Sequence, residues 1–568
     1  MAGEVVTVQL GNYANFVGSH WWNLQEEYLC NGSQALKHAE INNNVLFREG
    51  LAMHGRPKYT PRVVLLDLKG SLGSLKQEED AYQRTQSTQH CITWDGPLTA
   101  HCTEAAEKNE YLRDLKKHDE NSMRREVLRP RAANDTRSRS SMGSKVYWLE
   151  DSVKVWSDFQ RVPLHPRSIS ILKQYSHEGE SDRLATFGLG FQLLSHPDVA
   201  EDFEDRLHFF VEECDHLQGF QLLCDWEDGF SGFACRAVEI LHDYYDAKGV
   251  LTWGLLPGPS QTKVQVPGRN VNHVLNSALA IAHLAESSSL LCPLSVCPSF
   301  KCRPSTPLNF PHIQYQADMK YHSSAILASA LETSTLPYRL NSSPASLCQY
   351  AESLNYCGRK VAVTRLSFPF SLARGWCLPD ALTRHALETS WQCLCPSGYE
   401  QSERCFTQAV SLRGVSAHQS RGFVPPGKEP MSRLHACESG ESVLSLYLQT
   451  QYPNMPNSVL LAETPINVKT PFPNIFSSSI DQNGYLAEET RSAATAVQQV
   501  SALTAVQSAA GLHSSLQELC AEATRFAGSM ATGMEQEDLS NALHNLHSLA
   551  DNYKFGFGES DVDESDSD

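Results

Sequence analysis

Two short apolar runs near the start of the chain constrain the fold most strongly. Residues 5–10 read Val-Val-Thr-Val-Gln-Leu and residues 63–68 read Val-Val-Leu-Leu-Asp-Leu, which predicts a strand at each position. Between them, residues 13–28 carry bulky apolar side chains at helical spacing. A strand, a helix and a second strand in this order predict a βαβ unit and therefore a parallel sheet. The expected fold class is α/β, beginning with a Rossmann-type, doubly wound domain.

The length of the chain predicts more than one structural unit. With 568 residues, the chain exceeds the size at which a single hydrophobic core stops growing. We expect an N-terminal domain at 1–260, a second α/β domain at 261–480, and C-terminal helices with an acidic tail at 481–568. Residues 76–145 are rich in charges, Gln, Ser and Asn, which predicts a solvated, disordered insertion. Residues 391–433 are rich in turn formers and permit no assignment.

The net charge and the lack of targeting signals favour a cytoplasmic protein. A formal net charge of −18 disfavours nucleic acid and anionic lipid as general partners. The start of the chain lacks both a hydrophobic signal region and an Arg-rich presequence. We find no run of about 18 apolar residues. Protein partners are therefore expected, and any contact with a membrane should be peripheral.

The 17 cysteines are odd in number and scattered along the chain, which favours reduced, mostly buried thiols. Cys292, Cys297 and Cys302 recur every five residues, and Cys393 and Cys395 precede Cys405. Neither set has the paired Cys-x-x-Cys spacing of a zinc site. We therefore predict no metal site.

Three segments resemble tubulin, in the order in which tubulin has them. Residues 9–18 resemble its first phosphate loop, and residues 59–68 resemble the strand that leads toward the nucleotide's metal and terminal phosphate. Residues 214–222, Cys-Asp-His-Leu-Gln-Gly-Phe-Gln-Leu, are nearly the tubulin sequence that precedes its glycine-rich phosphate loop. The resemblance implies a tubulin-like fold for the N-terminal domain.

Further segments resemble the Misato family of tubulin-related proteins. They include His-Trp-Trp-Asn at 20–23, Asp-Leu-Lys-Gly-Ser-Leu at 67–72, Trp-Ser-Asp-Phe at 156–159, Arg-Leu-His-Phe at 206–209 and Trp-Gly-Leu-Leu-Pro-Gly-Pro at 253–259. On these segments the chain is identified as a member of that family, and the resemblance runs through nearly its whole length. The resemblance implies a role in mitochondrial distribution and morphology.

The phosphate loop that the resemblance implies is degenerate. Tubulin reads Gly-Gly-Gly-Thr-Gly-Ser-Gly, whereas residues 227–233 read Glu-Asp-Gly-Phe-Ser-Gly-Phe. A phosphate cradle needs approachable backbone N–H groups at a helix N-terminus. Glu227 and Asp228 instead add two negative charges, and like charges about 4 Å apart repel by on the order of 4 kcal/mol at an effective dielectric constant of 20. We therefore expect GTP to bind weakly or not at all.

Two other positions depart from tubulin. Lys69 stands where tubulin has a glutamate, which removes acidic support for a water-held magnesium and, with Glu227 and Asp228, suggests a self-neutralised pocket. The counterpart of tubulin's hydrolysis-promoting Asn-x-Asp-x-x-acid segment begins at Asn341 and contains neither acid. We predict no catalytic residue and no bound cofactor. The positions of the degenerate nucleotide site are Gly11, Asn12, Asp67, Lys69, Glu227, Asp228, Gly229, Ser231, Gly232 and Asn341.

Three functional hypotheses follow. The first is a noncatalytic tubulin-like protein that regulates mitochondrial distribution and morphology, attached peripherally to the mitochondrial outer membrane through mitochondrial-surface or cytoskeletal proteins. The second is a GTP-binding switch or filament-forming tubulin relative, which would need nucleotide to bind in an unusual geometry. The third is a tubulin-folding or spindle-assembly cofactor. A nucleotide titration separates the second from the others, and the identity of native partners separates the first from the third.

The chain ends in an acidic segment, residues 559–568, in which Ser560, Ser565 and Ser567 lie between aspartates and glutamates. We expect a solvated tail. Ser560 and Ser565 each have an aspartate three residues on, so an acid-directed kinase could add roughly −1.5 to −2 charges at each site.

Overall fold

The computed structural model describes most of the two expected domains and both C-terminal helices. The described residues are 3–30, 40–51, 57–75, 107–118, 147–177, 183–258, 269–300, 306–342, 345–388, 391–396, 404–422, 432–453, 455–487, 495–528 and 533–554. The acidic tail, with its three candidate phosphorylation sites, lies outside these residues.

A six-stranded sheet forms the centre of the N-terminal domain. Its order is β5-β4-β1-β6-β7-β8, and every neighbouring pair is parallel. The strands are β1 (Glu4–Leu10), β4 (Val63–Lys69), β5 (Ile169–Ser176), β6 (Leu217–Asp225), β7 (Gly249–Leu256) and β8 (Leu290–Ser295). The expected α/β class with a parallel sheet is confirmed.

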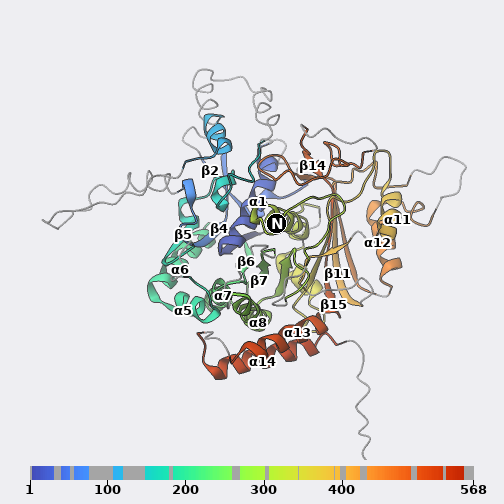
Figure 1. Cartoon of the computed structure of the whole chain (residues 1–568). Helices are drawn as coiled ribbons and strands as arrows, with labels where there is room; N and C mark the ends of the chain where they lie inside the picture. The colour runs from blue at the N-terminus through green and yellow to red at the C-terminus, as the bar shows by residue number, and fades with distance from the viewer. Residues whose placement is uncertain are drawn as a thin grey trace, which may run out of the picture.

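Helices cover both faces of this sheet (Figure 1). Along β1, Val6, Val8 and Leu10 belong to one core cluster, whereas Val5 belongs to another, as the alternation of side chains along a strand requires. The first cluster contains α5 (Phe187–Ser195), α6 (Pro197–Glu212), α7 (Phe230–Tyr245) and α8 (Arg269–Ser287). The opposite face packs against α1 (Asn12–Cys30) and α9 (Lys320–Ser334). The sheet is therefore doubly wound, as expected.

A second, five-stranded sheet forms the other domain, in the order β10-β9-β15-β11-β12. Only β11 and β12 are parallel, so the sheet is mixed. Its strands are β9 (Val363–Ser367), β10 (Gln392–Cys393), β11 (Cys405–Arg413), β12 (Asn457–Ala462) and β15 (Ala502–Ala509). Because β15 is the middle strand, the second sheet extends beyond residue 480, where we expected this domain to end.

Helices also pack on the second sheet. The helices α11 (Leu378–Glu388) and α12 (Gly440–Gln451) share a core cluster with β11 and β15, and Figure 1 shows them at the outer edge of the molecule. The C-terminal helices α13 (Leu512–Phe526) and α14 (Gln536–Asp551) form a pair beside α8 (Figure 1). Shorter elements are β2 (Phe47–Leu51), β3 (Pro57–Pro61), α10 (Leu347–Leu354), β13 (Ile466–Asn467), β14 (Gln499–Val500), and the 3-10 helices η1 (Asn43–Val45), η2 (Gly73–Leu75), η3 (Trp156–Phe159), η4 (Pro166–Ser168) and η5 (Leu336–Tyr338).

Part of the expected solvated insertion is packed against the core. Residues 107–118 contain helical turns, and Tyr111 among them is only 1% exposed. Its ring lies 5.5 Å from that of Tyr147, and Asn109 Nδ2 donates to the backbone oxygen of Asp158 at 2.7 Å. The expectation was therefore wrong for this piece, because one buried aromatic side chain fixes it despite its polar neighbours. Residues 76–106 and 119–145 lie outside the described residues.

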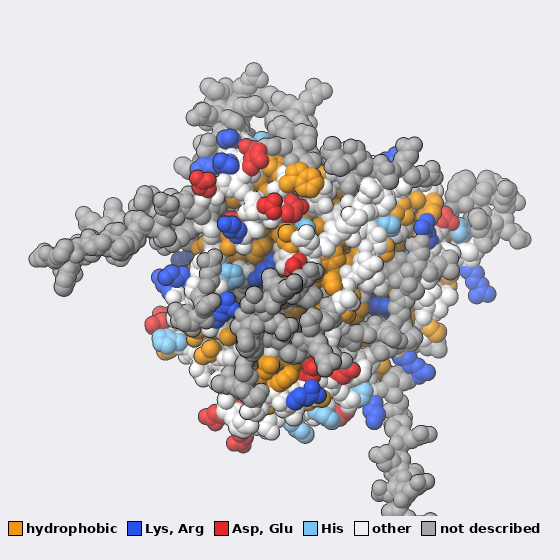
Figure 2. All heavy atoms as spheres, viewed as in Figure 1, with side chains coloured by type: hydrophobic (Ala, Val, Ile, Leu, Met, Phe, Trp, Pro, Cys, Tyr) orange, Lys and Arg blue, Asp and Glu red, His pale blue; other side chains and the backbone are white. Residues whose placement is uncertain are grey.

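Two observations bear on possible contact with a membrane. Within the described residues, no helix combines the length and the apolar character that crossing a bilayer requires. Figure 2 shows acidic and basic side chains interspersed over the described part of one face. A run of six arginines between Arg124 and Arg139, which could contact acidic partners or anionic lipid, lies outside the described residues.

A buried ionic cluster joins the two domains. Glu332 on α9 is fully buried and accepts hydrogen bonds from Arg339 at 2.6 Å and Arg413 at 2.9 Å. Trp21 on α1 donates its indole N–H to the same carboxylate at 3.0 Å. Both guanidinium groups are also buried, with side-chain exposures of 1% and 0%. One carboxylate therefore connects α1 and α9 to the last residue of β11 in the second sheet.

The variant Glu332→Gln tests this connection. It removes the charge that faces two buried guanidinium groups, and breaking a buried pair in this way typically costs about 3–5 kcal/mol in the free energy of unfolding. Urea denaturation followed by circular dichroism measures the loss. The matched control is Glu239→Gln, whose carboxylate pairs with Arg236 at 2.6 Å with both side chains at least one third exposed, and whose loss should cost about 1 kcal/mol or less. Equal losses in the two variants would contradict the assigned role of Glu332.

Candidate functional site

The turn from β1 into α1 lies at the carboxyl end of the parallel sheet, where α/β proteins bind ligands. The strand β1 ends at Leu10, and α1 begins at Asn12. Gly11 joins them with a φ of 105°, a backbone conformation that favours glycine. A Cβ atom at this position would lie 2.5 Å from an oxygen of Asp225. Glycine is thus required here by both the backbone and the neighbouring side chain.

Asp225, the last residue of β6, places its carboxylate at the N-terminus of α1. Its two oxygens accept hydrogen bonds from the backbone N–H groups of Tyr13 at 2.8 Å and Ala14 at 2.7 Å. The first N–H groups of a helix lack partners within the helix, and its dipole favours an anion there. In phosphate-binding proteins the ligand supplies that anion. In this chain a carboxylate of the protein itself supplies it.

Asp67 on the neighbouring strand β4 is also surrounded by donors from the protein. It is fully buried, and one of its oxygens accepts from Trp156 Nε1 at 2.9 Å, Asn15 Nδ2 at 3.1 Å and Asn12 Nδ2 at 3.5 Å. The other oxygen accepts from the backbone N–H of Leu68 at 2.8 Å. Burial raises the pKa of Asp67, and these hydrogen bonds oppose the shift. Both oxygens are therefore engaged without a metal-bound water.

The counterpart of the glycine-rich phosphate loop is residues 227–233, which follow β6 and include the first residues of α7, and which are here called the β6–α7 turn. Its backbone N–H groups are already bonded within the protein: Gly229 to Leu184 O at 2.9 Å, Phe230 to Asp228 Oδ1 at 3.0 Å, Ser231 to Asp228 O at 3.2 Å, and Gly232 to Gly229 O at 3.1 Å. The Ser231 hydroxyl likewise donates to Asp228 O at 2.6 Å. Four N–H groups that a phosphate cradle would present are thus engaged elsewhere.

The two glycines of this turn allow a neighbouring helix to approach closely. A Cβ on Gly229 would lie 2.6 Å from Leu184 Cγ, and a Cβ on Gly232 would lie 1.9 Å from Phe187 O. Gly190 on α5 meets the same turn, because its Cβ would lie 1.6 Å from Gly229 O. These contacts explain both glycines of the turn by the packing of α5 on α7. Asn276 on α8 adds to this packing by donating to Glu227 O at 3.2 Å.

Carboxyl groups of this site interact with one lysine. Lys320, the first residue of α9, donates its Nζ to Asn12 Oδ1 at 2.9 Å. Burial and Asp228 raise the pKa of Asp225 well above its ordinary value, whereas Lys320 opposes the shift. Burial, followed by repulsion from Glu227, raises the pKa of Asp228 to about 7. The site thus combines three nearby acidic groups with a lysine that the sequence analysis did not select.

The structure brings most of the predicted positions together, but not all of them. Gly11, Asn12 and Asp67 meet at the start of α1, and the turn with Glu227 and Asp228 interacts electrostatically with them. The other members of that turn are Gly229, Ser231 and Gly232. The side chain of Lys69 is exposed where β4 ends.

Asn341 lies apart from this group. It follows α9, which begins at Lys320 in the site and whose 15 residues span roughly 22 Å. Its backbone N–H donates to Glu40 O at 3.0 Å. Ser346, at the second acidic position of the implied segment, caps α10 by accepting from Gln349 N at 3.1 Å. The segment that begins at Asn341 thus leads into the start of α10.

The sequence analysis missed Asp225, Lys320, Trp156 and Asn15. Asp225 had a usable signal, since it is the charged residue that ends a buried strand directly before the recognised turn. Asn15 had a weaker one, because it lies one helical turn after Gly11. Lys320 is 308 residues from its partner Asn12, and Trp156 is 89 from Asp67. No local pattern could have joined these last two to the site.

The pH dependence of the stability of the variant Asp228→Asn tests the electrostatics of the site. Since the folded state raises the pKa of Asp228 from 3.8 to about 7, its stabilising protonation is fully present below about pH 3.8 and is lost as the pH rises through about 7. Asparagine cannot lose this proton, so the melting temperature of the variant relative to wild type should increase between about pH 5 and about pH 8. Glu239→Gln, which removes a partly exposed carboxylate of α7 outside this site, serves as the control for loss of a charge. A difference for Asp228→Asn that stays flat or falls with pH would contradict the shift.

Comparison with known proteins agrees with this architecture. Residues 3–117 match the family model described as Misato Segment II tubulin-like domain, and residues 148–340 match the Tubulin domain model. Protein misato homolog 1 of Homo sapiens is 42% identical over 567 residues, which cover 98% of each chain. The Danio rerio protein of the same name is 40% identical, covering 100% of this chain and 99% of that one, and protein misato of Drosophila melanogaster is 30% identical, covering 97% and 98%. This chain therefore belongs to the Misato family, whose members contain tubulin-like domains.

Proposed function

We propose that this chain is a noncatalytic, tubulin-like protein that regulates mitochondrial distribution and morphology by binding other proteins. The observation that carries the noncatalytic part is the position of Asp225. Its carboxylate accepts both Tyr13 and Ala14 N–H groups, the groups that a nucleotide phosphate would use at this helix start. The protein thus fills its own anion site.

Competition from this carboxylate is strong because it is part of the chain. A phosphate would have to displace a carboxylate that folding already holds at the site. A free ligand loses translational and rotational freedom when it binds, whereas the carboxylate does not. Displacement would also leave the buried Asp225 without its two donors, and an unsatisfied buried group is costly. GTP binding therefore faces two penalties at the same helix start.

The surrounding charges oppose nucleotide binding as well. Asp228 and Glu227 both raise the pKa of Asp225, so all three acidic groups lie close enough to interact. Lys320 is the cation whose influence on Asp225 and Asp228 opposes theirs. A triphosphate placed here would add several negative charges to this group. Lys320, rather than the expected Lys69, is the lysine that lies beside these acidic groups.

The mitochondrial part of the proposal rests on family membership. Its peripheral character rests on the lack of a membrane-spanning helix within the described residues. The resemblance to the Misato family is what implies the mitochondrial role, and the human and Drosophila melanogaster relatives align with 98% and 97% of this chain. No described helix could span a bilayer, which favours peripheral attachment to the mitochondrial outer membrane through protein partners. Cytoskeletal proteins are the second class of expected partner, because the fold is that of a cytoskeletal subunit.

The first test is a titration of the full chain with a non-hydrolysable GTP analogue and Mg²⁺. We expect no saturable binding up to about 1 mM, a limit that corresponds to roughly 4 kcal/mol of binding free energy. Phosphate release from GTP should be no faster with wild type than with Asp67→Asn. This variant is the control because its preparation would contain the same contaminating GTPases. Wild-type turnover above that of Asp67→Asn would refute the noncatalytic assignment.

A second test asks whether Asp225 occupies the anion site. Asp225→Ala frees the N–H groups of Tyr13 and Ala14, so we expect this variant to bind pyrophosphate measurably by calorimetry when wild type does not. Asp225→Asn is the matched control, since its amide oxygen can still accept one of the two hydrogen bonds. It should bind more weakly than the alanine variant. Equal binding by wild type and Asp225→Ala would show that the carboxylate does not compete with anions.

A third test concerns attachment to mitochondria. The chain should co-sediment in part with mitochondria and be released by carbonate extraction, because the described helices offer no membrane span and peripheral proteins depend on polar contacts that high pH disrupts. An outer-membrane protein with a helical anchor serves as the retained control. Retention of this chain with that control would contradict peripheral attachment, and recovery wholly apart from mitochondria would contradict the proposed place of action.

A further inference from the structure

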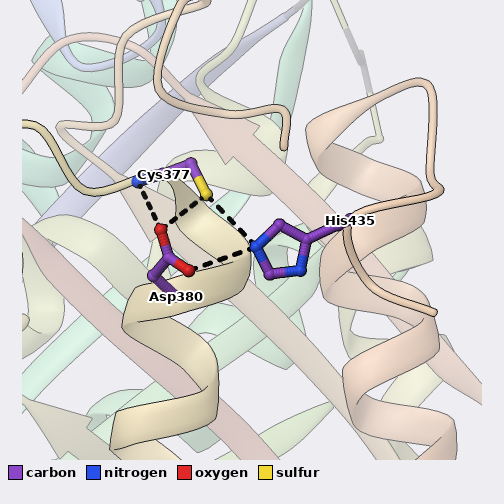
Figure 3. A group of neighbouring side chains, drawn as sticks. All are labelled: Cys377, Asp380 and His435. Carbon is purple, nitrogen blue, oxygen red and sulfur yellow. Dashed lines mark hydrogen bonds and ion pairs between the residues drawn. The ribbon is translucent and has the colours of Figure 1, made fainter. Parts of the chain in front are cut away.

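Three potential metal ligands converge on the outer side of the second domain, away from the nucleotide-type site. Cys377 immediately precedes α11, and Asp380 lies in the first turn of that helix. His435 comes from the segment that leads into α12. Figure 3 shows their side chains pointing toward one another from these two elements. Within the described parts of the chain, this is the one group of three such residues whose ligand atoms all lie within 4.8 Å of one another.

The three side chains approach one another at distances comparable with those between the ligands of a tetrahedral zinc site, with a different oxygen of Asp380 facing each partner. His435 Nε2 lies 3.1 Å from Asp380 Oδ1 and 3.8 Å from Cys377 Sγ, and Cys377 Sγ lies 2.9 Å from Asp380 Oδ2. Zinc bonds of about 2.0–2.3 Å at tetrahedral angles separate such ligand atoms by about 3.3–3.6 Å. Adjustments of up to about 0.6 Å, the largest between Cys377 Sγ and the Asp380 carboxylate, would therefore accommodate an ion. Rotation of side chains on two short segments can supply them.

Neighbouring groups hold the ligands in this orientation. Ser432 Oγ lies 2.8 Å from His435 Nδ1, so the other ring nitrogen, Nε2, faces Cys377 and Asp380. A hydrogen bond to the non-ligating nitrogen is the usual companion of a metal-bound histidine. Leu378, next to Cys377, is fully buried and donates its N–H to Gln419 O at 2.7 Å. The start of α11 is thus fixed relative to the rest of the domain.

The site is open to solvent on one side. The side chain of His435 is 9% exposed, whereas that of Asp380 is 42% exposed. An ion held by three side chains could therefore complete its tetrahedron with water. A nucleophilic role for the thiol fits less well, because burial and the adjacent Asp380 raise the pKa of Cys377 and so disfavour the thiolate at neutral pH. A bound metal cation would reverse this preference, because its positive charge stabilises the thiolate.

We propose that Cys377, Asp380 and His435 bind one divalent transition-metal ion, with zinc as the best fit to a thiolate, an imidazole and a carboxylate. Binding replaces the S–H bond of Cys377 with an S–metal bond, and the released proton goes to solvent. The ion would connect the start of α11 to the segment before α12. The sequence analysis predicted no metal from local cysteine spacing, and it could not detect this group because His435 lies 58 residues from Cys377.

The first experiment uses the unaltered full chain, stripped with a chelator and desalted. Iodoacetamide labelling, mapped by mass spectrometry, reports the accessibility of each thiol with and without one equivalent of Zn²⁺. We expect Zn²⁺ to protect Cys377 and to leave Cys357, an exposed cysteine, unprotected. Equal labelling of Cys377 in both conditions would overturn the proposal. This readout does not depend on any variant folding.

The second experiment tests the ligands with Co²⁺, which gives a thiolate-to-metal charge-transfer band only when a cysteine is bound. Wild type and the control Cys357→Ser should show this band with one equivalent of Co²⁺, whereas Cys377→Ser should lose it. His435→Gln should weaken binding by more than Ser432→Ala, whose loss of the orienting hydrogen bond should weaken it about tenfold or more. An unchanged band in Cys377→Ser, or its absence in wild type, would also overturn the proposal.

Discussion

The organisation of the N-terminal site depends on the hydrogen bonds between the Asp225 carboxylate and the first N–H groups of α1. Every α-helix begins with N–H groups that lack partners, and at the carboxyl end of a parallel sheet these groups commonly bind an anionic ligand. In this chain β6 ends in an aspartate that reaches Tyr13 and Ala14. Gly11 leaves the space that this carboxylate occupies. The protein itself thereby supplies a carboxylate at the helix start where nucleotide-binding domains hold a phosphate.

The helix α9 relates this site to the rest of the molecule. Lys320 at its start contacts Asn12, and Glu332 near its end forms the buried cluster with Arg339 and Arg413. The same helix therefore supplies the cation of the site and the carboxylate that connects the two domains. Hydrogen bonds at the two ends of this one helix therefore reach the start of α1 and the second sheet.

Much of the fold could be predicted from the sequence, because the strand and helix periods of β1, α1 and β4 are strong and local. The resemblance to tubulin also assigned Gly11, Asn12 and Asp67 to one site, and they meet because the carboxyl ends of neighbouring parallel strands share one edge. Contacts that depend on the packing of distant segments could not be predicted, as Lys320 and Trp156 illustrate. The glycines of the β6–α7 turn resembled a phosphate loop, but α5 packs closely against them. Sequence alone does not distinguish a glycine that admits a phosphate from one that admits a helix.

The most direct test of the central claim is an experimental structure of the full chain, determined in the presence of excess GTP and Mg²⁺. The proposed account predicts that the Asp225 carboxylate remains bonded to Tyr13 N and Ala14 N and that no nucleotide density appears at the start of α1. Phosphate density at these two N–H groups, with Asp225 displaced from them, would contradict it.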